Sequence, residues 1–364
     1  MSDPTPEELA LELLDLPTLC GRDPGVLARR CRYGENPWQK PAGLYATPGT
    51  DPLALPRFEL VAGGDPSYIN WCDVDRGLTT LTHIAAALAE VGETRHHVAV
   101  VLKHGNACGA GVSSDFRKEA LEAAIDGDPE AAFGGVVITN FPVESYCGVV
   151  LRNHRVPHGG KRILDGLVAP DIPADTVDEL RRKDGKGFFL VNPALGHLSK
   201  QSLSTETIIR QVRGGFLTQP NFSFVLDWLL PELSWYGPEP TIAKKNNLLL
   251  ARAVGSTGTS NTITLANRGR ILANATGQQS RVLACELALM KARRADNDIA
   301  GAVAYSDSFF PFPDGPKLLI DAGVTAILAS SGSIRDEQTI RLCEEHKVSL
   351  CLIPDALGRG FYGH

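Results

Sequence analysis

The sequence predicts an α/β protein built from two units of similar size. Short apolar runs alternate with helical segments along most of its 364 residues, which is typical of a sheet flanked by helices. The apolar runs lack the alternating polar residues of half-exposed strands, so we expect buried strands in a mostly parallel or mixed sheet. This length and a hydrophobic content of 43% are enough for about two domains with sizeable cores.

The first unit is expected over residues 25–195, after an acidic amphipathic extension at 1–24. The segment LTTLTHIAAALAEVG predicts a helix, and Val98–Leu102 predicts a buried strand that we expect to be parallel. A helix over FRKEALEAAIDG and a strand over GGVVITN continue the alternation.

An irregular connector, rich in proline and tryptophan, is expected at 196–240, before a second unit at 241–364. The second unit begins with a helix over KKNNLLLARAVG and a hairpin that turns at Asn267–Gly269. It continues with a helix over SRVLACELALMKARRA, strands over AGAVAYSD and TAILASSG, a helix over EQTIRLCEEH and a strand over VSLCLI. The two units show no convincing repeat from residue to residue.

Composition excludes several classes of protein. The net charge of -6 leaves no basic stripe, which argues against a nucleic-acid-binding protein. The eight cysteines are scattered without a CxxC pair, which is typical of a reducing compartment. The acidic N-terminus lacks the basic region of a secretion signal, and no apolar stretch approaches the roughly 18 residues that span a bilayer. We therefore expect a cytoplasmic protein without a membrane partner.

The most informative residues are Lys103 and His104, which directly follow the strand at Val98–Leu102. In open α/β sheets, ligands bind beyond the carboxyl ends of strands. A lysine offers a cationic donor there, and a histidine can take a proton near neutral pH. Solvated charges at a strand end would look the same. A loop is expected to follow, carrying Asn106, Cys108, Gly109 and Gly111.

Four further segments place unusual residues in turns or at strand ends: 32–39, 128–135, 259–262 with 276–281, and 306–315. Arg32 suits a phosphate but also a surface turn. The glycines at 134–135 allow close approach of a ligand or simply a tight turn. Ser280 is expected to cap a helix whose first turn holds Arg281, a placement that favours a bound anion. The phenylalanines of FFPFPD form either a wall for a planar ring or a corner of the core.

Taken in this order, the segments resemble the AICAR transformylase domain of the bifunctional purine-biosynthesis enzyme, where AICAR is the aminoimidazole carboxamide ribonucleotide. The resemblance runs from about residue 30 to the C-terminus, without the IMP cyclohydrolase domain, so the chain resembles a stand-alone transformylase. The family's patterns RYGxNPxQ, KHxxPxG, SAFGG, SN(S/A), GxGQxSR, SDxFFPFxD and GGSIRD correspond to residues 32–39, 103–109, 131–135, 260–262, 276–281, 306–314 and 331–336.

The resemblance implies two cytidine-deaminase-like three-layer α/β units and a homodimer whose sites lie at the subunit interface. It implies that 10-formyltetrahydrofolate donates its formyl group to the 5-amino group of AICAR. The zinc signature of the deaminases, HxE with PCxxC, is not found in the sequence, so no zinc is expected. A structural potassium ion near Ser260–Asn261 is a further expectation, because some relatives hold one.

The resemblance also assigns residue roles. His104 would be the base, Lys103 the proton donor and Asn261 a hydrogen-bonding partner. Because neighbours on a strand point to opposite faces, the chain must leave extended geometry for Lys103 and His104 to share a site. The nucleotide would be bound by Arg32, Tyr33, Asn70, Phe133, Gly134, Asp165, Lys183, Arg281, Phe309 and Arg359. The pterin would be held by Pro311, Phe312 and Asp314.

The sequence also departs from the family patterns. Trp38 stands where a histidine is common, and Ala107 stands where proline is usual. Two alternatives therefore remain open: a formylase that uses another formyl donor, and a nucleotide-binding sensor with the same pocket and no turnover.

Overall fold

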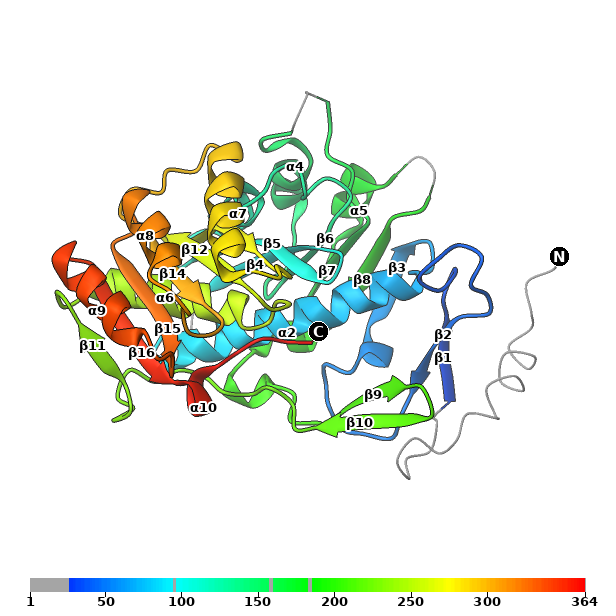
Figure 1. The fold of residues 1–364 in the computed structure, drawn as a ribbon. Coiled ribbons are helices and arrows are strands. Elements are labelled where there is room, and N and C mark those ends of the chain that lie inside the picture. Colours follow the sequence, from blue (N-terminus) through cyan, green and yellow to red (C-terminus); the bar gives the residue numbers. More distant parts are fainter. Residues whose placement is uncertain (1–25, 94–95, 157–159, 183–184, 364) are drawn as a thin grey trace.

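A computed structural model describes residues 26–93, 96–156, 160–182 and 185–363 (Figure 1). Among these residues, twelve strands form one mixed sheet in the order β11-β16-β15-β14-β12-β13-β5-β4-β6-β7-β8-β3. Two further hairpins, β1–β2 and β9–β10, are separate from it. The predicted α/β class is confirmed. The extension expected at 1–24 lies outside the described residues.

The first half of the sheet is built from the chain up to β8. In chain order its elements are β1 (Val26–Arg30), β2 (Gly43–Ala46), β3 (Glu59–Gly63), α2 (Tyr68–Glu90), β4 (His97–Lys103), β5 (Asn106–Ser113), α3 (Arg117–Asp126), β6 (Val136–Thr139), α4 (Ser145–Asn153), β7 (Gly166–Ala169), α5 (Ala174–Leu180) and β8 (Phe188–Val191).

The second half follows two short 3₁₀ helices, Pro193–His197 and Lys200–Ser202. Its elements are β9 (Ile208–Val212), β10 (Gly215–Gln219), β11 (Ser234–Tyr236), α6 (Ile242–Gly255), β12 (Ile263–Asn267), β13 (Arg270–Ala275), α7 (Arg281–Arg294), β14 (Val303–Ser306), α8 (Asp314–Asp321), β15 (Ala326–Ser331), α9 (Asp336–Glu345), β16 (Ser349–Pro354) and α10 (Asp355–Gly358). No helix within the described ranges is long and apolar enough to cross a bilayer.

Helices cover both faces of the sheet and make three layers. In Figure 1, α2 runs along one face, and α4 and α7 lie on the other. Strand β4 shows why both faces are buried: Val98, Val100 and Leu102 share a core with α2 and α6, whereas Ala99 and Val101 pack with α3 and α4. This alternation explains the unbroken apolar run in the sequence.

The expected direction of the strand at Val98–Leu102 is wrong. Strand β4 pairs antiparallel with both β5 and β6. The hairpin inserts β4 between β5 and β6, which are joined by α3 and run in the same direction. The apolar run therefore reflects helices on both faces rather than parallel pairing.

The loop expected after His104 is also wrong, because the segment forms strand β5. Its small residues allow the backbone of α3 to approach the strand. A Cβ on Gly109 would lie 2.2 Å from the Ala124 carbonyl oxygen, and a Cβ on Gly111 would lie 2.3 Å from that of Ala120. The glycines thus serve helix–sheet packing.

The other predicted helices and strands are confirmed, including the hairpin at Asn267–Gly269, in which Arg268 and Gly269 have φ values of +51° and +70°. The connector expected at 196–240 is less irregular than predicted. It holds the β9–β10 hairpin, and β11 extends the sheet by pairing with β16. The proposed domain boundaries stay a prediction.

The two halves repeat one order of elements: an edge strand, a central helix, a hairpin and three helix–strand pairs. Hydrogen bonds repeat as well. The Gly134 N–H, just before β6, donates to the Ile163 carbonyl at 2.7 Å, and the Gly301 N–H, just before β14, donates to the Gly323 carbonyl at 2.9 Å. Both donors have positive φ, +71° and +76°. The halves are therefore structural repeats.

We expect Gly111→Ala to destabilise the fold by about 1–3 kcal/mol, because the added methyl meets the α3 backbone. Urea unfolding followed by circular dichroism measures this loss. Gly215→Ala is the matched control, since a Cβ there meets nothing within 4 Å. Equal stability of the two variants would contradict the close approach of α3 to β5.

His83 gives the core a dependence on pH. Its ring stacks on Phe222 with centroids 5.4 Å apart, and its Nδ1 lies 2.7 Å from the Thr79 carbonyl oxygen. Burial lowers the pKa of His83 from 6.5 to about 4. The neutral ring therefore contributes stability that is complete above pH 6.5 and is lost as the pH falls toward 4.

Between pH 7 and pH 5 we expect this loss to be about 2 kcal/mol. His83→Phe keeps the ring stack and removes the titration, so its unfolding free energy should fall by less over the same interval. Urea unfolding of both proteins at the two pH values makes the comparison. A wild-type loss no larger than that of His83→Phe would show that His83 is not the group responsible.

Candidate active site

The turn between β4 and β5 places Lys103 and His104 at one end of the sheet. Lys103 pairs with Asn106 across the turn, and the two central residues, His104 and Gly105, have φ values of +55° and +70°. This is the backbone of a type I′ hairpin turn. The expectation that the chain leaves extended geometry here is confirmed. A left-handed non-glycine residue costs on the order of 1 kcal/mol, so neighbouring contacts must hold it.

Lys103 is fixed by the segment that precedes β6. Its Nζ donates to the Phe133 carbonyl oxygen at 2.7 Å, and a Cβ on Gly134 would lie 3.9 Å from that nitrogen. Lys103 is half-buried, whereas His104 is exposed. The ammonium group is therefore held in place while the imidazole faces solvent.

Asp165 joins this group from the residue before β7. Its N–H donates to the Gly135 carbonyl at 2.9 Å, and its carboxylate accepts from Arg182 at 2.9 Å. The β4–β5 turn meets the segments that precede β6 and β7, because β4 runs antiparallel to β6 and β7. Lys103 thus lies at the carboxyl end of β4, as expected, whereas Phe133 and Asp165 lie before the amino ends of β6 and β7.

Asp73 on α2 holds the β4–β5 turn by a hydrogen bond. It was not predicted from the sequence as a site residue. Its Oδ1 accepts the Gly105 N–H at 2.6 Å. Burial raises the pKa of Asp73, and the nearby charge of Asp165 adds to the rise, whereas the Gly105 N–H and His104 oppose it. The carboxylate therefore lies near both predicted site residues.

A second cluster forms around Asn261 and Arg281 in the other half. The Asn261 Nδ2 donates to the Gln278 carbonyl at 2.7 Å, and its Oδ1 accepts from the Arg281 Nη2 at 2.6 Å. Arg281 also forms an ion pair with Asp307, and the two side chains are 8% and 0% exposed. Asn261 is thereby locked in one orientation.

The start of α7 differs from the expectation in how Ser280 caps it. Ser280 is the N-cap residue of α7, but its side chain makes no capping hydrogen bond. Arg281 does lie in the first turn, and the negative group that balances it is Asp307 of this same chain. Its role toward a bound nucleotide stays a prediction.

One side chain connects the two clusters. The Asn106 Oδ1 accepts both the N–H and the Oγ1–H of Thr259, at 3.2 and 3.0 Å. Thr259 lies two residues before Asn261, so this pair of bonds places the Lys103–His104 turn beside the Asn261 loop. The residues that supply the predicted base and its hydrogen-bonding partner are brought together across the two halves.

The predicted nucleotide-binding residues near the N-terminus gather at the start of α2. The Tyr33 carbonyl accepts the Tyr68 N–H at 2.9 Å, and the Arg32 guanidinium lies 5.3 Å from the centre of the Tyr33 ring. Asn70 is buried, and its Oδ1 accepts from the N–H and Oγ of Ser67 at 3.0 and 2.9 Å. That oxygen therefore forms the capping box of α2 together with the N-cap residue, Ser67.

The predicted pterin-binding residues form a third group beside β14 and α8. Phe310 is buried, whereas Phe312 is 47% exposed and lies 4.2 Å beneath the Arg335 guanidinium. The FFPFPD segment thus both packs into the core and presents a ring to solvent. Pro311 is exposed as well, and the Asp314 carboxylate accepts the Gly315 N–H.

Arg359 packs over Phe309 at 5.7 Å and forms an ion pair with Asp355 at 2.8 Å. Among the described residues, no hydrogen bond or ion pair joins this third group to the Lys103–His104 turn. Lys183, which was also predicted to bind the nucleotide, lies outside the described residues.

The oxygen atoms near Ser260, where a potassium ion is expected, make contacts within the chain. The Gly258 carbonyl accepts the Tyr362 N–H at 2.9 Å, and the Thr259 carbonyl accepts the Gly277 N–H at 2.6 Å. The Asp307 carboxylate is bound by Arg281 and by the Ser260 hydroxyl. A carbonyl oxygen with one donor still has a second lone pair, so the expected potassium ion stays a prediction.

Sequence reasoning missed Asp73, Asn106 and Asp307 as residues that organise the site. Asp307 follows directly after β14 and is fully buried, and a buried carboxylate at a strand end is a recognisable signal. Asp73 and Asn106 carry no such signal, because their partners lie 32 and 153 residues away.

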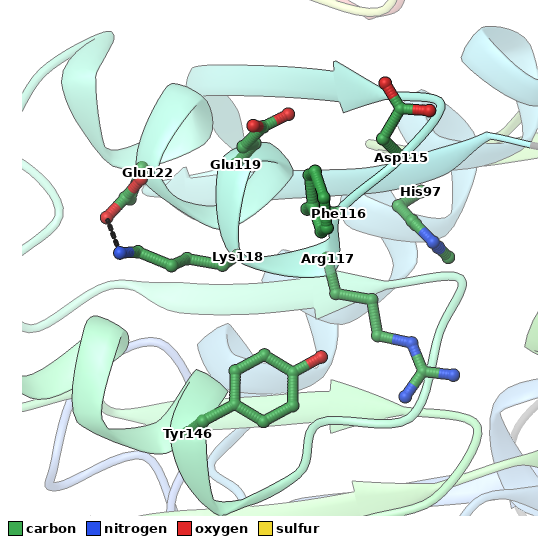
Figure 2. A pocket seen from close by; sticks show the side chains of 8 residues that line it. All are labelled: His97, Asp115, Phe116, Arg117, Lys118, Glu119, Glu122 and Tyr146. Atoms are coloured by element: carbon green, nitrogen blue, oxygen red, sulfur yellow. Dashed lines mark ion pairs between the residues drawn. The ribbon is translucent and has the colours of Figure 1, made fainter.

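The open pocket shown in Figure 2 is separate from this site. It has a volume of about 500 Å³ and is lined by His97, Arg117, Tyr146 and neighbouring residues. His97 begins β4 and Lys103 ends it, so the pocket lies about 20 Å from the turn, at the other end of the strand.

Comparison with known proteins supports the resemblance seen in the motifs. The chain is similar to the bifunctional purine biosynthesis protein PurH of Aquifex aeolicus, with 29% identity over 325 residues that cover 88% of this chain and 57% of that protein. PurH of Bacteroides thetaiotaomicron is 31% identical with the same coverage, and PurH of Anoxybacillus flavithermus is 31% identical over 89% of this chain and 58% of that protein.

The chain thus spans less than two thirds of the length of these relatives. The model of one family, described as the AICARFT/IMPCHase bienzyme, matches residues 23–291. That range includes β1–β13, nearly all of α7, the Lys103–His104 turn and the Asn261–Arg281 cluster. The chain belongs to the AICARFT/IMPCHase bienzyme family.

Proposed function

We propose that this protein is an enzyme of purine biosynthesis that transfers the formyl group of 10-formyltetrahydrofolate to the 5-amino group of AICAR. Its products would be formyl-AICAR and tetrahydrofolate. The observation that carries the proposal is the Lys103–His104 turn, held beside the Asn261 loop by Asn106. The proposal assigns formyl transfer alone to this chain, not closure of the ring to IMP.

The transfer needs two proton movements, and the turn offers a group for each. The AICAR amine is a poor nucleophile because it is conjugated with the imidazole ring. As its nitrogen bonds to the formyl carbon, His104 takes the amine proton. As the bond from that carbon to the folate N10 breaks, Lys103 gives a proton to the leaving nitrogen. Asn261 donates a hydrogen bond to the oxyanion of the tetrahedral intermediate.

The predicted binding residues divide between the two substrates. Arg32, Tyr33, Asn70 and Arg281 would bind the nucleotide, with Phe133, Gly134 and Asp165 beside its base. Phe309 and Arg359 would also bind the nucleotide. Pro311, Phe312 and Asp314 would hold the pterin. The free cysteines in the described part of the chain agree with a protein of the reducing cytoplasm.

We expect purified protein to release tetrahydrofolate from 10-formyltetrahydrofolate only when AICAR is present. His104→Ala should lower kcat by about 10²–10⁴-fold, because the amine proton then has no acceptor. A spectrophotometric assay of tetrahydrofolate measures both. His346→Ala, which removes an exposed histidine at the end of α9, is the matched control and should keep full activity.

Unchanged turnover in His104→Ala would reject the assigned role. Formyl transfer from another donor, but not from the reduced folate, would favour the first alternative. Tight AICAR binding by calorimetry with no transfer from any donor would favour the nucleotide sensor.

We also propose that a second copy of the chain completes the site. Pro311 and Phe312 are exposed, so we infer that a second copy supplies a further wall for a folate bound to them. Sedimentation equilibrium should give twice the mass of one 39.1 kDa chain. A monomer that is fully active at the same concentration would contradict this arrangement.

A further inference from the structure

The turn that carries His104 has a counterpart in the other half of the molecule. The β4–β5 hairpin turns through His104 and Gly105, with φ values of +55° and +70°. The β12–β13 hairpin turns through Arg268 and Gly269, with values of +51° and +70°. The same strained backbone is therefore built twice, on two different sequences.

Each turn is held by the sixth residue of the central helix of its own half. On α2, the Asp73 Oδ1 accepts the Gly105 N–H at 2.6 Å. On α6, the Asn247 Oδ1 accepts the Gly269 N–H at 2.9 Å. A neutral amide is thus sufficient to hold such a turn, and the geometry alone does not require the negative charge of Asp73.

The charge of Asp73 faces the residues to which the proposed function gives a role. His104 and Asp165 are the charged partners that act on it, and Arg76 of the same helix packs beneath Gly105, where a Cβ would lie 3.9 Å from its Cγ. Lys103 is fixed by the Phe133 carbonyl. A carboxylate in this position attracts a positive charge that forms on His104.

We propose that Asp73 is a positioning residue for the formyl transfer: it holds the His104–Gly105 turn and sets a negative charge beside His104. The inference rests on the proposed function. When His104 takes the amine proton its ring becomes positive, and a fixed opposite charge stabilises that state relative to the neutral ground state. This role assigns Asp73 no contact with substrate, so kcat should respond to its replacement and the KM for AICAR should not.

Two substitutions separate the two tasks of Asp73. Asp73→Asn removes the charge but keeps an oxygen that can accept the Gly105 N–H, as the Asn247 amide does for Gly269. We therefore expect kcat to fall at least about tenfold while the turn stays intact. Asp73→Ala removes both the charge and the acceptor, so kcat should fall by about 10²-fold or more. Steady-state kinetics gives kcat and KM. Hydrogen exchange of the peptide spanning residues 98–112 reports on the Gly105 N–H, and exchange should be faster in Asp73→Ala only.

Asn247→Ala is the matched control, because it releases the equivalent β12–β13 turn. That turn lies at the opposite end of the paired strands β5 and β13. The substitution should speed exchange around Gly269 and leave kcat within about twofold of wild type. If Asp73→Asn keeps the wild-type kcat, the charge has no role. If Asp73→Ala leaves the exchange unchanged, or raises KM instead of lowering kcat, the positioning role is wrong.

Failure of this inference is distinguishable from failure of the proposed function. Wild-type protein that releases no tetrahydrofolate refutes the proposed function, and with it the catalytic part of the inference. The exchange experiment uses no substrate and still decides whether Asp73 holds the turn. Asp73→Asn is nearly isosteric, so it remains informative if Asp73→Ala does not fold.

Discussion

The junction of β5 with β13 is the contact on which the candidate site depends. The two halves of the sheet pair there through Gly111 and Arg270, and the buried Asn274 side chain donates to the Ala107 carbonyl at 3.0 Å. The turn after β4 belongs to one half and the loop before β12 belongs to the other. Their spacing is therefore set by this junction, and dense packing on both faces of the sheet resists any sliding of one half along the other.

The two halves of the sheet share one arrangement of elements, but only the first half carries the two residues that move protons in the proposed formyl transfer. Lys103 and Asn267 occupy equivalent positions, and each donates to a carbonyl three residues before the next strand of its own half. His104 and Arg268 are also equivalent, but a guanidinium cannot accept a proton near neutral pH. Because β5 and β13 are antiparallel, the two turns lie at opposite ends of the joined sheet. The architecture therefore positions residues, and the side chains decide which end is reactive.

Local patterns predicted most of the elements, and long-range contacts decided what the sequence could not predict. Apolar periodicity is a property of a few neighbouring residues, so most helices and strands were recognisable. The glycines of β5 are typical of a loop until α3 is seen against them. The repeat is not visible from residue to residue, because the features that the two halves share are backbone hydrogen bonds and positive φ angles, which many side chains accommodate. For the site, the adjacent Lys103–His104 pair was visible, whereas Asp73 and Asn106 act through partners distant in sequence.

Three of the charged residues expected to bind substrates already form ion pairs within the chain. Arg281 is bound to Asp307, Asp165 to Arg182, and Arg359 to Asp355. A substrate phosphate that reached Arg281 would compete with a fully buried carboxylate, and breaking a buried pair is costly because it leaves an unpaired charge. Under the proposed function, a ligand therefore gains only the difference between its own contacts and these internal ones. The exposed His104 imidazole and Phe312 ring can contact a ligand without breaking an ion pair. Under the proposed function, these two groups accept the amine proton and hold the pterin.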